Sequence, residues 1–502
     1  MTQAAASVLS LDPTQPVHFV GIGGVGMSGL AKILLEAGFQ VSGSDVSESA
    51  YTRTVKDLGA TVYKGHAKGQ VPPNAVVIVS SSINQENPEI AEALANRQGI
   101  YHRSDLLREV LQGNLLGHET TIGITGTHGK TTITGMTGLM LHDAGIKPTV
   151  VVGGKMPRLQ TNATLSPDKK FAVAELDESD GTLIQYQPTL SVIANLELDH
   201  ADHYTNGLQG VLDKFKAYLG SLKPGSKVLA NASCPNTKAL LCENTDLTAH
   251  LQVIWLGEAD IFTGQEPETT YWLKNARHYA KGCYQAYVYR KGKMLGELNM
   301  SVPGRHNLFN ALCAIAVGDQ LGVDFDELAD SLQAFTGMGR RFEKVGERKG
   351  ALLVDDYAHH PSEVSATLKA AKESVQHSHG RVVAVFQPHR YTRLKALWPE
   401  FLTCFDEADV VIITDVYAAH EAKMPGVEAE AFVRQMSHPN VHYVPFTPAF
   451  DALHNALEGC VQPGDLVISM GAGNITGLLR QWNNEARAIS VQGSAPALSE
   501  LL

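Results

Sequence analysis

Short runs of apolar residues recur along the chain, and each run ends in glycine or polar residues. Residues 17–20 form the first run, and Met27, Leu30 and Ile33 behind it repeat at the spacing of one helical face. This order predicts a strand, a glycine turn and a helix. Further runs that we predict as strands lie at 39–41, 75–79, 121–124, 171–174, 190–194, 352–354, 382–386 and 466–470. Polar clusters follow most of them, as expected where parallel strands end at a ligand-binding sheet edge.

The length of 502 residues is enough for roughly three domains. Glycine-marked loops after the strands at 17–20 and 121–124, and near residue 337, divide the chain accordingly. We therefore predict an α/β protein in which each domain is built on a mostly parallel open sheet. The predicted domains are a Rossmann-like domain at 1–117, a central domain of the P-loop ATPase type at 118–336 and a second Rossmann-like domain at 337–502.

Composition narrows the possible partners. Acidic residues outnumber basic ones by 52 to 41, which argues against a broad surface for nucleic acid or anionic membranes. No apolar run approaches the roughly 18 residues that span a bilayer. The first basic residue is Lys32, so the start of the chain does not resemble a secretory signal. We therefore expect a cytoplasmic protein without membrane insertion. The six cysteines form no CxxC pair, which predicts free thiols in protein cores.

The first glycine loop is GIGGVG at 21–26. It matches the GxGxxG spacing at Gly21, Gly23 and Gly26. Asp45 lies about 20 residues further on, where dinucleotide-binding folds place an acid that binds ribose. The segment predicts a diphosphate site, and the residues leave open whether the ligand is a nicotinamide cofactor or another diphosphate.

The second glycine loop is TGTHGKTT at 125–132. It departs from the general P-loop pattern, because the glycine five positions before Gly129 is missing. The residues that bind phosphate in such a loop are nevertheless present. Gly126 and Gly129 let backbone N–H groups approach phosphate oxygens, and Lys130 can reach the terminal phosphates. The Thr131 hydroxyl can bind Mg²⁺. The segment predicts a site for ATP.

Two of the predicted strands in the central segment end in acidic runs, ELDESD at 175–180 and NLELDH at 195–200. The carboxyl ends of parallel strands converge beside the phosphate loop. Carboxylate oxygens with one imidazole suit a hydrated Mg²⁺ that bridges phosphates. The sequence therefore predicts a magnesium site at this edge.

The last third of the chain is rich in arginine and histidine at strand ends. GMGRRF at 337–342 resembles a flexible joint, from which Arg341 can swing onto a transferring phosphate. Arg390 and Arg393 follow a later strand and offer a fork for a small carboxylate. Together with the two loops, these features predict an ATP enzyme with two further substrates that activates an acid by phosphoryl transfer.

These segments, taken together, resemble the Mur ligase family. The resemblance covers nearly the whole chain and rests on GIGGVGMSG at 21–29, TGTHGKTT, ELDESD, DH at 199–200, HN at 306–307, RRF at 340–342 and DDYAHHP at 355–361. It implies a ligase that uses ATP with Mg²⁺ or Mn²⁺. The implied substrates are UDP-N-acetylmuramate, whose lactyl carboxylate forms an acyl phosphate, and L-alanine, whose amine attacks it in peptidoglycan synthesis. We further expect a monomer or a weak homodimer.

The resemblance also implies roles for individual residues. The catalytic residues would be Lys130, Glu175, His200, Arg341 and His359, and the metal ligands would be Thr131, Glu175 and His200. The ATP contacts would be Gly126, Thr127, His128, Gly129, Lys130, Thr131, Thr132, His306, Asn307, Arg341 and Asp356. The UDP-sugar contacts would be Gly21, Gly23, Gly24, Gly26, Met27, Ser28, Asp45, His66, Ser80, Thr161, Asn162, Glu178 and Ser179. The amino-acid contacts would be Tyr357, His359, Arg390 and Arg393.

Three other interpretations stay open on the sequence. A sister ligase that adds a preformed tripeptide or another amino acid would share the first two loops, and only the pocket around His359, Arg390 and Tyr417 would distinguish it. A nicotinamide dehydrogenase explains the loop at 21–26 but leaves the loop at 125–132 unused. A degenerate ligase that only binds nucleotide is disfavoured by the joint presence of the catalytic residues.

Overall fold

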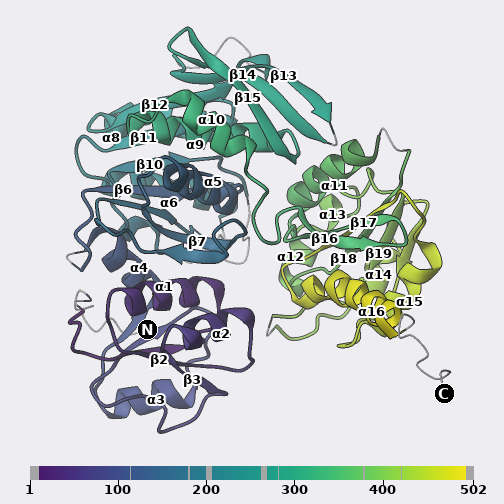
Figure 1. Cartoon of the computed structure of the whole chain (residues 1–502), viewed down its shortest axis with the longest axis horizontal. Coiled ribbons are helices and arrows are strands. Elements are labelled where there is room, and N and C mark those ends of the chain that lie inside the picture. Colours follow the sequence, from purple (N-terminus) through teal and green to yellow (C-terminus); the bar gives the residue numbers. More distant parts are fainter. Residues whose placement is uncertain are drawn as a thin grey trace, which may run out of the picture.

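The computed structural model describes residues 9, 11–113, 115–178, 181–198, 206–261, 268–280, 282–376, 379–419 and 421–492. Three sheets of mostly parallel strands follow one another along the chain, each with helices packed on it (Figure 1). The predicted α/β fold with three domains is confirmed.

The first sheet is wholly parallel, with the order β3-β2-β1-β4-β5. Its strands are β1 (Val17–Val20), β2 (Val41–Asp45), β3 (Thr61–Lys64), β4 (Val76–Val79) and β5 (Ile100–His102), and its helices are α1 (Val25–Glu36), α2 (Ala50–Asp57), α3 (Pro88–Ala95) and α4 (Arg103–Gln112). Strand β2 begins later than predicted, because the Phe39 N–H donates to Leu34 O and closes the end of α1. The loop after β1 lies where the strand order reverses, at the usual ligand site of such sheets.

The central sheet has the order β15-β14-β13-β12-β11-β10-β6-β9-β7-β8. Its strands are β6 (Thr120–Thr125), β7 (Thr149–Met156), β8 (Thr161–Thr164), β9 (Phe171–Glu175), β10 (Leu190–Ile193), β11 (Lys227–Asn231), β12 (Gln252–Glu258), β13 (Tyr271–Ala280), β14 (Cys283–Arg290) and β15 (Lys293–Pro303). Its helices are α5 (Lys130–Asp143), α6 (Leu208–Ser221), α7 (Pro235–Cys242), α8 (Thr245–Thr248), α9 (His306–Gln320) and α10 (Phe325–Gln333). Strand β6, which leads into the phosphate loop, pairs in parallel with β9 and β10. The acidic strand ends therefore flank that loop.

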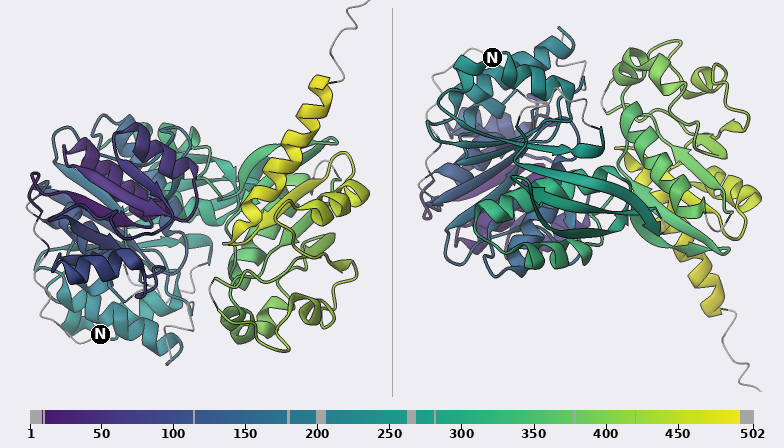
Figure 2. Two further views of the ribbon diagram at one scale, coloured as in Figure 1. Left: turned by 90° about the horizontal axis from the view of Figure 1, so that it is seen from below. Right: turned by 90° about the horizontal axis from the view of Figure 1, so that it is seen from above.

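The third sheet has the order β16-β17-β21-β18-β19-β20, in which only the edge strand β16 is antiparallel to its neighbour. Its strands are β16 (Glu343–Arg348), β17 (Ala351–Asp356), β18 (Val382–Phe386), β19 (Val410–Ile413), β20 (Val441–Tyr443) and β21 (Leu466–Met470). Its helices are α11 (Pro361–Val375), α12 (Tyr391–Ala396), α13 (Trp398–Phe401), α14 (Ala429–Val433), α15 (Asp451–Cys460) and α16 (Leu478–Gln492). Figure 2 shows α16 extending beyond the body of this domain.

The first and central domains share one continuous apolar cluster, in which Leu30 and Ile33 of α1 join Ala172 and Phe215. The Lys32 ammonium of α1 also donates to the Thr161 hydroxyl at 2.9 Å. The third domain contacts the central one through α11, where Tyr284 Oη donates to Glu373 at 2.7 Å. These contacts hold the ligand-binding edges of the three sheets toward a common space.

All six cysteines are free, as predicted. Cys242 is nevertheless exposed, so the expectation of a buried thiol is wrong there. None of the helices in the described part of the chain is long and apolar enough to cross a bilayer.

Candidate active site

The phosphate loop at 125–132 joins β6 to α5. Gly129 adopts φ 87° as it starts the helix, and Gly126 adopts φ 127°. A Cβ on Gly126 would lie 2.9 Å from Asn195 O, so only glycine fits this approach. The turn directs the first backbone N–H groups of α5 outward, as a phosphate site requires.

Lys130 lies in this loop, and its ammonium contacts other groups of the protein. Its Nζ donates to Gly126 O at 2.7 Å and to Thr127 O at 3.1 Å, and it lies 2.7 Å from Glu178 Oε2. Burial lowers the pKa of Lys130, but Glu178, Asp177 and Glu175 outweigh this effect and raise it, so the ammonium stays charged. The resemblance assigned Glu178 to the UDP-sugar. In the structure its carboxylate, which is only 3% exposed, contacts Lys130.

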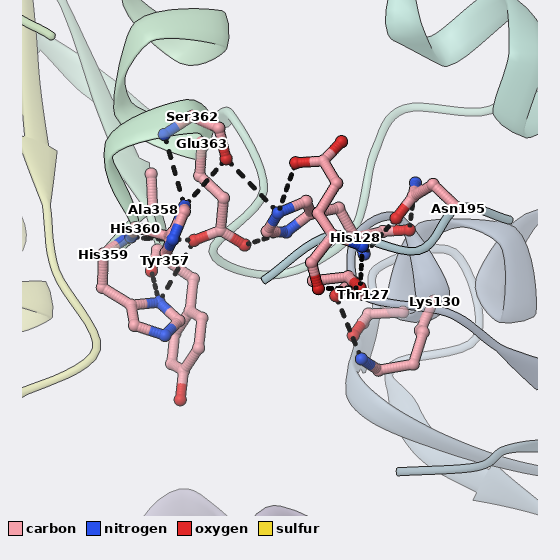
Figure 3. A network of polar contacts seen from close by, with 12 residues as sticks. Thr127, His128, Lys130, Asn195, Tyr357, Ala358, His359, His360, Ser362 and Glu363 are labelled. Atoms are coloured by element: carbon pink, nitrogen blue, oxygen red, sulfur yellow. Dashed lines mark hydrogen bonds and ion pairs between the residues drawn. The ribbon is translucent and has the colours of Figure 1, made fainter. Parts of the chain in front are cut away.

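Asn195, which follows β10, holds the loop through hydrogen bonds to its backbone. Its Oδ1 accepts the His128 N–H at 2.8 Å, and its Nδ2 donates to His128 O at 3.1 Å (Figure 3). The Thr127 hydroxyl exchanges hydrogen bonds with the backbone of Glu197 in the same segment. These contacts hold the loop in its conformation.

The expected metal site is partly described. Thr131 Oγ1 donates to Glu175 Oε1 at 2.9 Å, and the Gly153 N–H donates to Glu175 Oε2 at 2.7 Å. Leu176 points into the core and is fully buried, so Glu175 faces the site. The predicted residues His200 and Ser179 lie outside the described residues. Within the described part of the chain, no cluster of three histidine, cysteine or carboxylate side chains is found, but a threonine hydroxyl beside a carboxylate fits Mg²⁺, which prefers oxygen ligands.

Two cavities meet at this loop. A cavity of about 290 Å³ is lined by the predicted ATP contacts His128, Gly129, Thr131, Thr132, His306, Asn307, Arg341 and Asp356. A larger one of about 840 Å³ is lined by Thr127, Lys130, Thr131, Thr161, Asn162, Glu175, Arg341, Tyr357 and His359. The second cavity joins predicted nucleotide, sugar and amino-acid contacts from different domains. Of the predicted ATP contacts, only Gly126 lines neither cavity.

The joint between the central and third domains carries Arg341. Its guanidinium lies over the Tyr357 ring, 5.2 Å from the ring centroid, and 3.8 Å from Glu363 Oε1. Burial lowers the pKa of Arg341, but the neighbouring carboxylates of Glu363, Asp356 and Glu175 raise it. Arg341 therefore carries a full charge at the wall shared by both cavities.

Asp356 holds the joint in place. Its Oδ2 accepts the Phe342 N–H and its Oδ1 accepts the Ala358 N–H, both at 2.7 Å. Burial raises the pKa of Asp356 to about 6, and Arg341 opposes that rise. This residue lines the nucleotide cavity, but its carboxylate oxygens are directed to the backbone.

We predict that Asp356→Asn destabilises the third domain. An amide can accept only one of the two N–H groups, so a buried donor loses its partner at a cost of about 1–3 kcal/mol. Calorimetric unfolding of the variant measures this, with the exposed Asp57→Asn as the matched control. Equal stability of both variants and the wild type would contradict the role of Asp356.

The predicted amino-acid residues gather in the third domain. A chain of ring contacts joins Tyr357 to His359, His359 to His389 and His389 to Tyr417. Arg393 Nη1 lies 3.3 Å from His389 Nδ1, and Arg390 donates its N–H to Tyr417 O at 2.9 Å. Burial lowers the pKa of His389 to about 3, and the cations around it add to this effect, so the imidazole is neutral.

The predicted sugar-nucleotide residues lie around the first glycine loop. The Gly23 N–H donates to Asp45 Oδ2 at 2.9 Å, and Ser44 Oγ lies 2.8 Å from His66 Nδ1. Asn162 of the central domain donates to Ser28 Oγ at 3.1 Å. Met27 is buried behind the loop. Gly21, Gly24 and Gly26 belong to the loop itself, Ser80 follows β4 beside β1, and Thr161 accepts a hydrogen bond from Lys32 of α1.

Sequence reasoning missed several residues of the site. Asn310 lines the nucleotide cavity one helical turn after Asn307, a spacing that could have identified it. His389 directly precedes Arg390 at a strand end, which was also a visible signal. Asn195 stands in the run NLELDH at a strand end, but its contact with His128 had no sequence signal, and Glu363 had none either, since each acts through distant segments.

Family models match three consecutive parts of the chain. The model described as "Mur ligase family, catalytic domain" matches residues 16–114, "Mur ligase middle domain" matches residues 124–318, and "Mur ligase, glutamate ligase domain" matches residues 340–473.

Curated proteins and solved structures are similar over most of the chain. The UDP-N-acetylmuramate--L-alanine ligase of Synechococcus sp. (strain JA-3-3Ab) is 42% identical over 472 residues, which are 93% of this chain and 86% of that protein. The protein of the same name from Gloeobacter violaceus is 40% identical over 94% of this chain and 96% of its own length. The crystal structure of UDP-N-acetylmuramate-alanine ligase MurC from Thermotoga maritima aligns with a TM-score of 0.76 at 28% identity, covering 95% of this chain and 99% of that one.

Proposed function

Because the chain belongs to the Mur ligase family, we propose that it joins L-alanine to the lactyl carboxylate of UDP-N-acetylmuramate with cleavage of ATP to ADP and phosphate, a step of peptidoglycan synthesis. One observation carries this proposal. The cavity of about 840 Å³ is lined by Lys130, Glu175 and Arg341 for phosphoryl transfer, by Asn162 beside the sugar-nucleotide loop, and by His359 of the amino-acid pocket. All three substrates can therefore meet in one space.

Different residues of this cavity serve different parts of the phosphoryl transfer. The backbone of the phosphate loop and Lys130 bind the β- and γ-phosphates, so that the γ-phosphoryl group faces the sugar-borne carboxylate. Arg341 stabilises the charge that develops on the transferring group. Thr131 and Glu175 would hold Mg²⁺ or Mn²⁺, which supplies charge neutralisation at the phosphates when bound. His200, outside the described residues, stays a predicted third ligand.

The second half of the reaction belongs to the third domain. Arg390 and Arg393 bind the carboxylate of the amino acid, which leaves its amine free to attack the acyl phosphate. Neutral His389, packed on Tyr417, shapes this pocket without adding charge. Catalysis here needs positioning more than new bonds to the protein, and the residues of three domains that line one cavity supply it.

Arg390→Ala tests the amino-acid pocket. Loss of a charge-assisted hydrogen bond costs about 1.5–3 kcal/mol, so we expect the KM for alanine to rise at least about tenfold while the KM for ATP changes little. Lys395→Ala, an exposed cation on the same helix, is the matched control. An unchanged KM for alanine with a raised KM for ATP would reverse the assignment.

A substrate panel tests the function itself. Purified protein is mixed with ATP, Mg²⁺ and UDP-N-acetylmuramate together with L-alanine, serine, glycine or a preformed tripeptide, and phosphate release and product mass are followed. We expect the alanyl product. A product only with the tripeptide would support the sister ligase. In a separate mixture that contains NADPH in place of ATP, a change in nicotinamide absorbance on addition of UDP-N-acetylmuramate would support a dehydrogenase.

We also propose that the reaction takes place in the cytoplasm, that the protein acts as a monomer or weak homodimer, and that its domains comprise residues 1–117, 118–336 and 337–502.

A further inference from the structure

Glu363 lies between the nucleotide cavity and the amino-acid pocket. It is the third residue of α11, and its side chain is 15% exposed. The same carboxylate lines both the cavity of about 290 Å³ and that of about 840 Å³. Its two oxygens face different sites, as Figure 3 shows.

The first oxygen, Oε1, faces the nucleotide side. It lies 3.4 Å from His128 Nδ1 and 3.8 Å from Arg341 Nη1. His128 belongs to the phosphate loop of the central domain, and Arg341 belongs to the joint. Both cations therefore reach Glu363 from segments that will touch the nucleotide.

The second oxygen, Oε2, faces the amino-acid side. It lies 3.3 Å from His359 Nδ1 and accepts the N–H groups of His359 at 3.1 Å and of His360 at 3.3 Å. The His359 ring in turn contacts Tyr357 and His389. Since His359 Nδ1 also lies 2.9 Å from Tyr357 O, Oε2 and the Tyr357 carbonyl together position the near wall of the pocket proposed for alanine.

The charges around Glu363 show that it is ionised. Burial raises the pKa of this carboxyl group, but His359, His128 and Arg341 outweigh the effect and hold the pKa well below its usual value. Burial also lowers the pKa of His128, yet Glu197 and Glu363 raise it to about 10. The contact between His128 of the central domain and Glu363 of the third domain is therefore an ion pair. A movement of His128 or Arg341 toward phosphate changes the charge around Glu363, which is also the carboxylate that His359 contacts.

We propose that Glu363 is a positioning residue that couples the nucleotide site to the amino-acid site. Nucleotide phosphates hold the loop and the joint in the arrangement in which His128 and Arg341 contact Oε1. This keeps α11 seated on the phosphate loop and holds His359, through Oε2, in the orientation that receives the amino acid. By linkage, the amino acid tightens nucleotide binding by the same factor. The inference rests on the proposed function, because it assigns alanine to the pocket of His359.

A purely structural role for Glu363 can be separated from this one. Glu363 also closes the capping box of α11, in which His360 is the first partner. Glutamine serves in such a box as glutamate does, so Glu363→Gln keeps the helix start and removes the charge. Thermal unfolding of the variant checks that the helix and the domain are intact.

The test is the affinity for L-alanine, measured by calorimetry on the full chain with UDP-N-acetylmuramate and Mg²⁺, in the absence and presence of the non-hydrolysable ATP analogue AMP-PNP. In the wild type we expect the analogue to raise the affinity at least about fivefold. In Glu363→Gln we expect this ratio to fall close to one. Glu197→Gln is the matched control, because Glu197 lies 3.4 Å from His128 Nε2 but belongs to the central domain; it should keep the ratio.

A wild-type ratio in Glu363→Gln, or a ratio of one in the wild type, would overturn the inference. If Glu363→Gln does not fold, His128→Asn provides the test, because it leaves the cap of α11 in place. This variant should also lower the ratio of the alanine affinities, and an unchanged ratio would refute the coupling. Product formation by the wild type distinguishes a failure of the proposed coupling from a failure of the proposed function. Amide formed by the wild type with an unchanged ratio in the variant overturns the coupling alone, whereas no amide with alanine overturns the function as well.

Discussion

Replacing Lys130 by alanine is expected to lower the turnover at least about 10²-fold, the usual effect of removing one group that stabilises charge in the transition state. Lys130 is the cation of the phosphate loop, and carboxylates keep it protonated. Without it, the γ-phosphoryl group loses the positive charge nearest to the loop. Steady-state release of phosphate measures the effect, and a variant with near-normal turnover would count against the site.

The same substitution has a structural consequence that needs its own control. Glu178 would lose the partner that lies 2.7 Å from it, and a buried carboxylate without a counter-ion is costly. Burial already raises the pKa of Glu178 to about 7, and loss of Lys130 removes an opposing effect. A carboxyl group with a raised pKa in the folded state favours folding at low pH, and that contribution is lost as the pH rises through its folded pKa.

Lys130→Ala should therefore lose more stability near about pH 9 than near about pH 6. The double variant Lys130→Ala with Glu178→Gln removes the buried charge and should recover stability at high pH without recovering turnover. Recovery of turnover in the double variant would show that the first loss came from misfolding and not from the missing cation.

Arg341→Ala is expected to lower kcat about 10³-fold, the lower range for an arginine that stabilises a transferring phosphoryl group. The affinity for AMP-PNP should change far less, because the phosphate loop stays intact. Arg341→Lys keeps the charge but not the planar fork, so it should recover only part of the rate. Rapid-quench kinetics and calorimetry separate the two effects, and a fall in nucleotide affinity as large as that in kcat would make Arg341 a binding residue only.

The parts of this site that depend on local sequence were predictable. The phosphate loop needs glycine at 126 and 129 because both positions adopt a positive φ. The acids after β9 lie beside the loop because β9 pairs with β6. The short apolar runs likewise predicted strands in each of the three sheets, although β2 starts only at the last residue of its predicted run, Val41, because the end of α1 uses Phe39.

The contacts between distant segments were not predictable in the same way. Nothing in the run ELDESD shows that Glu178 turns to Lys130, 48 residues away in the chain, while Glu175 turns to Thr131. Glu363 has the sequence position of an ordinary capping residue, and only the docking of the third domain brings His128 to it. The first two pairs follow from how loops pack within the central domain and the third from how two domains dock, and residue spacing encodes neither.

In the proposed reaction the γ-phosphoryl group of ATP passes to the sugar-borne carboxylate before the amine attacks. UDP-N-acetylmuramate labelled with oxygen-18 in its lactyl carboxylate tests this order, with ATP, Mg²⁺ and L-alanine present and the released phosphate analysed by mass. We expect each phosphate to carry one labelled oxygen from the carboxylate. Unlabelled phosphate formed together with the amide would contradict it.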